Sequence, residues 1–307
     1  MNYRHFLLTR FNVPFIRKEN IDFLFEEEYL QERFRRFKDC CFNSIKQQSN
    51  QNFVWLVFFD ARTPRRYKDL NELWKREYSN YSPVYVDMQQ LLQEKSLFYE
   101  EQALKMTSKI HVEDLTYSEY VQRVGLPSFI SKVIKSFCGK DIDTIVTTRI
   151  DNDDVFHKDM MKSVIDNLHS EYGEKMILSF DNGVQYVDGS KILSKFYYPN
   201  NHFTSLVEKC SASLFSVFYW DHYFIDRYVM VKHINTIPLW MEICHKTNVM
   251  NSVDLTPNSK FIWDDVSLYD YGINKQWKAY ETFFSLMLHP QFYFIPKFKK
   301  IIRNIIR

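Results

Sequence analysis

The chain has 307 residues, 45% of them hydrophobic, with 40 lysines and arginines against 38 aspartates and glutamates. This length and apolar content allow a substantial core, arranged either as one large α/β unit or as two smaller domains. The formal net charge of +2 provides no general attraction to nucleic acid, so no nucleic-acid partner is expected.

Cysteine usage and hydropathy indicate a compartment. The five cysteines include no CxxC pair, which argues against a structural zinc site and favours reduced thiols in a cytoplasmic protein. The apolar run near the N-terminus is too short for a signal peptide, and no window of the sequence approaches a transmembrane helix. We therefore expect a cytoplasmic location.

In the first half of the chain, near-continuous apolar runs alternate with amphipathic patterns of helical period. This alternation favours parallel strands that are covered by helices on both faces. The predicted strands are residues 5–11, 53–59, 83–87 and 142–150. The predicted helices are residues 26–48 and 117–137, the second with a break near Gly125 and Pro127.

The second half of the chain has a different pattern. A helix is expected to start near Asp154, directly after the fourth strand. Residues 175–180 and 184–187 are extended segments that flank Asn182 and Gly183, a pair that favours a tight hairpin. From Pro238 onward the pattern becomes mixed and more helical.

The most informative segment is residues 151–154, with the sequence DNDD, here called the acidic segment. It follows a β-branched stretch that favours a strand. Three carboxylates within four residues repel one another unless a cation or hydrogen-bond donors compensate. A divalent metal is one such compensator, and the alternative is that Asp153 or Asp154 caps the next helix.

Several metal-site classes can be tested against this segment. An EF-hand loop requires an acceptor and a glycine where this chain has Val155 and Phe156. The six glycines form neither a P-loop nor a dinucleotide fingerprint. A metal-dependent nuclease would lack the usual basic bias. A D-x-D site that holds Mn²⁺ or Mg²⁺ against a nucleotide diphosphate fits best.

Three blocks in conserved order carry a family resemblance: residues 7–12 (LLTRFN), 53–60 (FVWLVFFD) and 148–154 (TRIDNDD). Together they resemble the bacterial putative rhamnosyltransferase family, which is similar to GT-A glycosyltransferases. Later blocks that also resemble this family are residues 179–186, 205–208 and 240–245. One departure follows His245, where the family tends to have glycines and this chain has Lys246, Thr247 and Asn248.

The resemblance implies an α/β fold with a GT-A-like, Rossmann-type mixed sheet flanked by helices, and a more helical C-terminal region. It implies a nucleotide-sugar-binding and catalytic domain at residues 1–235, with residues 236–307 closing the site. The corresponding function is metal-dependent transfer of a sugar, rhamnose by the family label, from a nucleotide-diphosphate donor to a glycan acceptor in surface polysaccharide synthesis. Two alternatives stay open: a phosphoryl-transfer enzyme or nuclease with the same aspartates, and a non-catalytic carbohydrate-binding protein.

The same resemblance distributes metal-binding roles. Asp151 and Asp153 form the D-x-D pair, with Asp153 as the leading metal ligand, and the metal offsets charge on the leaving phosphate. Asp154 either supports these ligands or caps the next helix. His245 is a further candidate ligand of the metal or of phosphate, against a purely structural role.

Donor-binding candidates lie at the ends of the predicted parallel strands, where open α/β sheets bind ligands. Arg10 and Arg149 could fork onto phosphate, although Arg149 could equally pair with an aspartate. Asp60 could accept a hydrogen bond from the ribose or the base, or could simply close its strand. Asp151 also belongs to this donor-binding set.

Transfer also requires a base for the acceptor hydroxyl. The candidates are Asp221 and His222, in the sequence YWDH, and Glu242, in the sequence WME. Trp220 beside Asp221 could stack on a sugar ring. The sequence does not separate Asp221 from Glu242.

The C-terminal residues 292–307 carry five basic residues and no acidic one. Ile301, Ile302, Ile305 and Ile306 would share one helical face. This pattern predicts either an interfacial helix attracted to anionic lipid on the inner face of the plasma membrane, or a terminal helix docked on the domain. A lipid-linked glycan acceptor would suit the first alternative.

Overall fold

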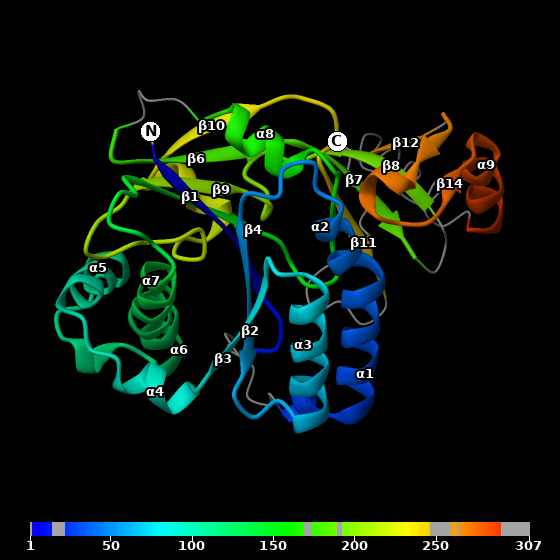
Figure 1. Ribbon diagram of the computed structural model, residues 1–307. Coiled ribbons are helices and arrows are strands. Elements are labelled where there is room, and N and C mark those ends of the chain that lie inside the picture. Colours follow the sequence, from blue (N-terminus) through cyan, green and yellow to red (C-terminus); the bar gives the residue numbers. More distant parts are fainter. Residues whose placement is uncertain are drawn as a thin grey trace, which may run out of the picture.

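The computed structural model describes residues 2–13, 22–168, 173–188, 192–245, 259–262 and 264–289. Within these residues the strands form a seven-stranded main sheet, a five-stranded second sheet and a two-stranded ribbon (Figure 1). The predicted α/β fold, with a mixed sheet flanked by helices, is confirmed.

The main sheet has the strand order β10-β6-β9-β4-β1-β2-β3. Strands β1, β2, β3 and β4 run parallel to one another, whereas β9 is antiparallel to both β4 and β6. The strands of this sheet are β1 Tyr3–Arg10, β2 Val54–Asp60, β3 Tyr81–Val86, β4 Thr144–Arg149, β6 Lys175–Phe180, β9 Ser205–Lys209 and β10 Met230–Ile234. The parallel half therefore brings the carboxyl ends of β1, β2 and β4 to one edge.

The second sheet has the strand order β12-β8-β7-β11-β5. Its strands are β5 Val155–Phe156, β7 Asn182–Val187, β8 Ile192–Tyr197, β11 Trp240–Cys244 and β12 Ser259–Phe261. The ribbon consists of β13 Val266–Ser267 and β14 Gln276–Trp277. Strand β11 pairs with β7 and β5, so this sheet contains residues from both sides of position 235.

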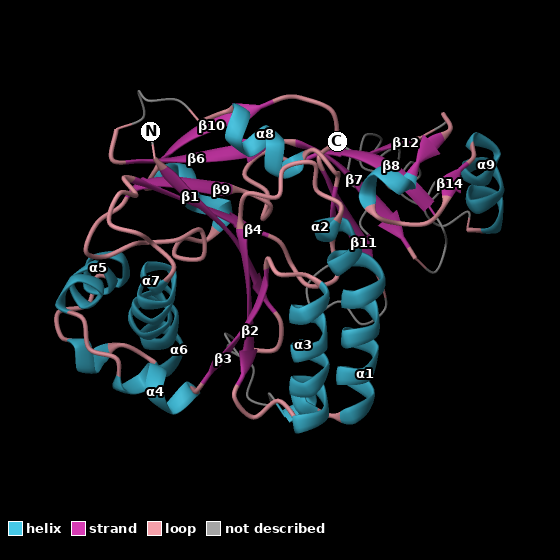
Figure 2. Cartoon of the chain, in the orientation of Figure 1, coloured by secondary structure: helices cyan, strands magenta, loops and turns pink. Residues whose placement is uncertain are grey.

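Helices α1, α2 and α3 lie on one side of the main sheet, and α4, α5, α6 and α7 lie on the other (Figure 2). The main sheet has a hydrophobic core on each face, and alternate residues of β2 belong to one core or the other. Trp55 packs with residues of α1 and α3, and Leu56 packs with residues of α5 and α7. The α-helices are α1 Glu27–Arg36, α2 Asn43–Lys46, α3 Arg65–Glu77, α4 Met88–Gln93, α5 Leu97–Thr107, α6 Tyr117–Tyr120, α7 Leu126–Ser136, α8 Met160–Asp166 and α9 Ala279–Leu288.

The four strands predicted in the first half are confirmed as β1, β2, β3 and β4, with ends that differ by a few residues. The predicted helix 26–48 contains α1, a π-helical stretch and α2. The break predicted near Gly125 is instead a second π-helical stretch that leads into α7. Gly125 lies against α4, because an added Cβ would meet the Leu91 carbonyl oxygen at 2.3 Å.

The hairpin predicted at Asn182 and Gly183 is wrong. Strand β6 belongs to the main sheet, whereas β7 belongs to the second sheet, so the two extended segments do not pair. The chain passes from one sheet to the other at Asp181. Gly183 is instead required by packing, since an added Cβ would lie 2.3 Å from the Trp240 ring.

The helix predicted to start near Asp154 is also wrong at its beginning. Residues 155–156 form β5, and α8 starts only at Met160. Neither Asp153 nor Asp154 flanks that helix, so the capping alternative does not apply to them. Their charge requires a different explanation.

In the described part of the chain, no helix combines the length and the apolar character needed to cross a membrane. The basic helix predicted within residues 292–307 and the residues directly after His245 lie outside the described residues.

Candidate functional site

The acidic segment connects the two sheets. It begins after β4 of the main sheet and ends at β5 of the second sheet. The Asn152 side chain ties it to the end of β1, because its Nδ2 donates to the Phe11 carbonyl oxygen at 2.8 Å. The segment therefore crosses the carboxyl edge of the parallel strands, where open α/β sheets bind ligands.

Asp154 is held between elements of the second sheet. Its Oδ1 accepts a hydrogen bond from the Ile243 backbone N–H of β11 at 2.9 Å, and its side chain is almost fully buried. Burial raises the pKa of Asp154 well above its ordinary value, and the charges of Asp153 and Glu242 raise it further. The fold thus places a carboxyl group where its negative charge is poorly compensated.

Asp151, Asp154 and His202 form a cluster, here called the Asp–His cluster. One potential ligand atom from each residue lies within 4.8 Å of the other two. His202 comes from the loop between β8 and β9, and its Nε2 lies 3.4 Å from Asp154 Oδ2. Burial lowers the pKa of His202, which favours the neutral imidazole that binds metals. Carboxylate oxygens and imidazole nitrogen suit a cation such as Mn²⁺.

Asp153 faces a different set of partners. Its Oδ2 forms an ion pair with Arg33 of α1 and lies 2.9 Å from His245 Nε2. Burial opposes ionisation, yet the Arg33 guanidinium holds the pKa of Asp153 below its usual range. The predicted ligands Asp153 and His245 are therefore in contact with each other, beside a buried arginine.

Arg149 forks onto Asp151, with Nη2 at 3.1 Å from both carboxylate oxygens. Of the two alternatives that the sequence leaves open for Arg149, binding phosphate or pairing with an aspartate, the structure shows the second. Burial of Asp151 opposes ionisation, but Arg149 leaves the pKa of Asp151 below its ordinary value.

Arg10 and Arg149 share an aromatic platform. Their guanidinium carbons lie 4.9 and 5.8 Å from the centroid of the Phe218 ring. Burial lowers the pKa of Arg10 to about 9, and the neighbouring charge of Arg149 contributes to the decrease. Two adjacent cations at the end of β1 and β4 form a suitable surface for an anionic group.

Glu242 lies on β11 next to the Asp–His cluster. Its Oε2 accepts a hydrogen bond from Gln185 Nε2 at 2.7 Å, between paired residues of β11 and β7. The side chain is buried, and its charge contributes to the raised pKa of Asp154.

Asp221 and His222 lie at the start of a 3₁₀ helix, residues 222–227. The Asp221 carboxylate caps this helix by accepting from the Tyr223 backbone N–H, and the side chain is 54% exposed. The His222 ring centroid lies 5.8 Å from that of His202, and burial lowers the pKa of His222 to about 3. His222 therefore connects the exposed Asp221 with the Asp–His cluster.

Asp60 closes β2 with its carboxylate turned to Arg62. It accepts from the Arg62 backbone N–H at 2.7 Å and from the guanidinium at 3.0 Å through each oxygen. Asn12 accepts from the Asp60 backbone N–H and joins this turn to the end of β1. That Asp60 accepts a hydrogen bond from the ribose or the base of a donor stays a prediction.

Two residues of this site are absent from the sequence-based predictions. Arg33 occupies the apolar stripe of α1 beside Leu30 and Phe34, and a charge on such a stripe indicates a buried partner. His202 had no comparable signal, since it lies in a loop and its neighbours in the cluster are distant in sequence.

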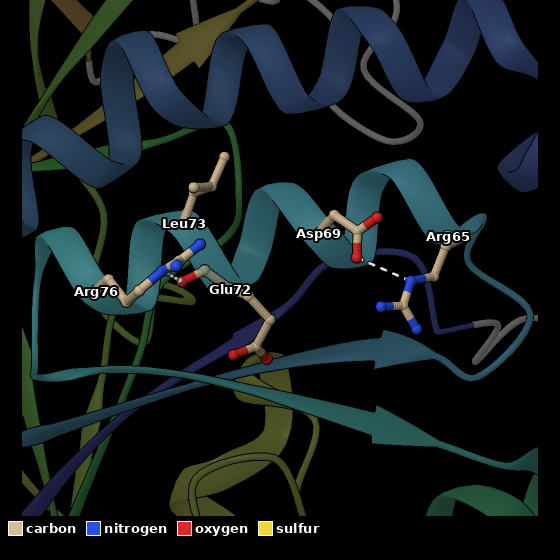
Figure 3. Close-up of a pocket in the computed structure, with 5 residues that line it drawn as sticks. All are labelled: Arg65, Asp69, Glu72, Leu73 and Arg76. Carbon is tan, nitrogen blue, oxygen red and sulfur yellow. Dashed lines mark hydrogen bonds and ion pairs between the residues drawn. The ribbon is translucent and has the colours of Figure 1, made fainter.

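A separate hollow lies along α3 (Figure 3). Its lining consists of Arg65, Asp69, Glu72, Leu73 and Arg76, and Arg65 pairs with Asp69 at 2.8 Å. These side chains belong to one exposed helix surface and include no residue of the candidate site. We assign no ligand to this hollow.

Comparison with known proteins gives one match at the level of a family. Residues 4–110 match the family model described as "Putative rhamnosyl transferase". This confirms the resemblance for 107 of the 307 residues, which contain β1 to β3, Arg10, Arg33 and Asp60. The acidic segment and the blocks after it lie outside the matched residues.

The comparison with solved structures finds similarity to two structures of S. aureus TarS 1-349, one alone and one in complex with UDP-GlcNAc. The first has 7% identity and a TM-score of 0.37, with 79% of this chain and 60% of that chain covered. The second has 11% identity and a TM-score of 0.39, with 84% and 62% covered. The chain thus spans less than two thirds of these structures. No curated protein matches it.

Proposed function

We propose that this chain is a metal-dependent glycosyltransferase that moves a sugar, rhamnose by the family label, from a nucleotide-diphosphate donor to a glycan acceptor of a surface polysaccharide. The observation that carries the proposal is the Asp–His cluster at the carboxyl edge of β4, beside Arg10 and Arg149. The family match at residues 4–110 supports the reaction class.

The cluster supplies donors that fit a divalent cation. Carboxylate oxygens of Asp151 and Asp154 and a ring nitrogen of His202 lie close enough to share one ion. When bound, Mn²⁺ or Mg²⁺ would act as a Lewis acid that offsets negative charge on the diphosphate. Asp153 and His245 form the second possible ligand set, which the sequence predicts. We favour the Asp–His cluster because its three potential ligand atoms lie within 4.8 Å of one another.

Arg10 and Arg149 would bind the diphosphate of the donor. Both guanidinium groups lie over the Phe218 ring, so packing as well as charge restricts them. Arg149 also holds Asp151, which links donor binding to the orientation of a proposed metal ligand.

We assign the base to Asp221 in preference to Glu242. A base must reach the acceptor hydroxyl, and the Asp221 carboxylate is exposed at the margin of the site. Glu242 is buried and accepts a hydrogen bond from Gln185, so it is better placed to orient the cluster than to meet an acceptor.

The test uses a panel of UDP-, GDP-, CDP- and dTDP-sugars, with release of the nucleoside diphosphate as the signal and water as the acceptor. We expect one donor to be hydrolysed with Mn²⁺ and not with a chelator. Asp221→Asn should reduce hydrolysis at least about a hundredfold, in the range expected for loss of a general base, while nucleotide affinity is kept.

Glu242→Gln serves as the comparison variant. Glutamine has nearly the same shape as glutamate, and we assign no proton transfer to Glu242. Absence of hydrolysis of every donor by the wild-type chain would contradict the proposed reaction. Equal rates for Asp221→Asn and the wild-type chain would contradict only the assignment of the base.

A further inference from the structure

Helix α9 exposes a continuous apolar face. Its large exposed side chains follow the spacing i, i+3, i+4, i+7 and i+8, which places them on one side of the helix. Each of these side chains is more than half exposed: Tyr280, Phe283, Phe284, Met287 and Leu288. Figure 1 shows α9 at the periphery of the molecule, beyond β14.

The opposite side of α9 fixes the helix to the protein. The Thr282 hydroxyl donates to the Ile262 carbonyl oxygen and accepts from Trp277 Nε1, and Leu286 is buried. At the start of the helix, the Ala279 backbone N–H donates to Asp265. The apolar face is therefore presented to the outside by specific contacts on the other side.

Charge is unevenly distributed along the sequence at this end of the chain. Glu281, the acidic residue of α9, is already paired with Lys275 at 2.7 Å and accepts from the Lys278 backbone N–H. In the sequence, the residues that follow the helix, 290–307, include five basic residues and no acidic one. An aromatic face followed directly by positive charge suits a negatively charged apolar boundary.

We propose that the exposed face of α9 docks on an anionic lipid bilayer. Aromatic rings are favoured at the membrane interface, and the lysines and arginines that follow α9 in the sequence are of the kind attracted to anionic headgroups. A second copy of the chain is a less suitable occupant, because it would carry the same basic segment after α9 in its sequence, whereas an anionic bilayer is opposite in charge. The inference concerns where the protein acts and goes beyond the proposed transferase activity.

The test measures co-sedimentation of the full chain with vesicles of phosphatidylcholine, with and without phosphatidylglycerol. We expect binding to the anionic vesicles that weakens at high salt. The variant Phe283→Ser/Phe284→Ser should partition at least about tenfold more weakly, because two rings no longer enter the interface.

The matched control is Leu97→Ser/Tyr117→Ser, which removes two exposed apolar side chains from other helices, 79% and 55% exposed. This control should partition like the wild-type chain. No binding of the wild-type chain to anionic vesicles, or equal binding by the α9 variant, overturns the proposal.

Sedimentation velocity without vesicles separates the remaining occupants. A wild-type dimer that Phe283→Ser/Phe284→Ser dissociates, with vesicle binding unchanged, would assign the face to a second copy and overturn the proposal. A lower thermal midpoint in that variant, again with unchanged vesicle binding, would assign the face to the chain's own residues and also overturn it.

Discussion

At the scale of single residues, close packing explains why position 183 is a glycine, although the sequence pattern predicts a turn there. Gly183 lies opposite Trp240 across the β7–β11 pair. The Trp240 ring stacks on Phe203 at 4.7 Å between centroids, and its Nε1 donates to the Phe180 carbonyl oxygen. This ring is fixed on several sides, so position 183 has no room for a side chain.

We predict that Gly183→Ala lowers the free energy of unfolding by about 1–3 kcal/mol, the usual cost of forcing an extra methyl group into a packed core. Urea denaturation checks the value. Gly139→Ala is the matched control, because an added Cβ there meets nothing within 4 Å. Equal stability of the two variants would show that the Trp240 ring can move.

Residue types predict the site in part. Crowded carboxylates destabilise a fold unless a partner compensates their charge. Residues 151–154 can therefore be identified as a candidate site from their charge alone. The partners of these carboxylates were harder to identify, since Arg33 and His202 reach the site through tertiary structure. Asn182 and Gly183 suggested a turn because local propensities contain no information about the Trp240 ring, which packs on Gly183 from another strand.

At the scale of elements, β9 holds the loop that leads to the proposed base. Glu208 of β9 accepts hydrogen bonds from the backbone N–H groups of Phe215 and Ser216, each at 3.0 Å. Ser216 has a φ of 58°, a conformation that a residue other than glycine rarely adopts. The loop continues to Phe218 and then to Asp221. Glu208 thus fixes the path of the loop that carries both.

Burial raises the pKa of Glu208 to about 7, from the ordinary value of about 4.5 that it has in the unfolded chain. Because the folded protein binds this proton more tightly, its stability falls as the pH rises from about 4.5 through about 7. Glu208→Gln removes this titration. We expect the wild-type chain to lose up to about 3 kcal/mol relative to the variant between pH 5 and pH 8.

Urea denaturation at several pH values measures this difference. The constant loss of one hydrogen-bond acceptor in Glu208→Gln does not affect the slope, so the pH dependence is diagnostic. Glu174→Gln is the control, because that side chain is 78% exposed and should leave the profile unchanged. A difference between the wild type and Glu208→Gln that does not vary with pH would refute this account of Glu208.

The predictability of the elements follows from their environment. Strands β1, β2 and β4 are buried on both faces, and their continuous apolar sequences identify them. The two-residue strand β5 was not predictable, since its pairing with β11 depends on residues 240–241, far along the chain. A short apolar pair after an acidic run favours a helix start when no partner strand is known.

At the scale of the whole molecule, the acidic segment is one of the places where the chain passes from the main sheet to the second sheet. Asp153 reaches α1 through Arg33, and Asp154 reaches β11 through Ile243. The proposed cation would therefore lie where the main sheet, the second sheet and α1 meet. The overall α/β class followed from the alternation of patterns, whereas this junction depends on strand partners that periodicity cannot specify.

The central claim is that the Asp–His cluster binds a divalent cation. Calorimetric titration of Mn²⁺ into the wild-type chain, His202→Gln and His245→Gln tests it most directly, with thermal midpoints to verify folding. We predict one Mn²⁺ site in the wild type, at least about tenfold weaker binding in His202→Gln, and nearly unchanged binding in His245→Gln. Wild-type-like affinity in a folded His202→Gln, or no binding by the wild-type chain, would contradict the claim.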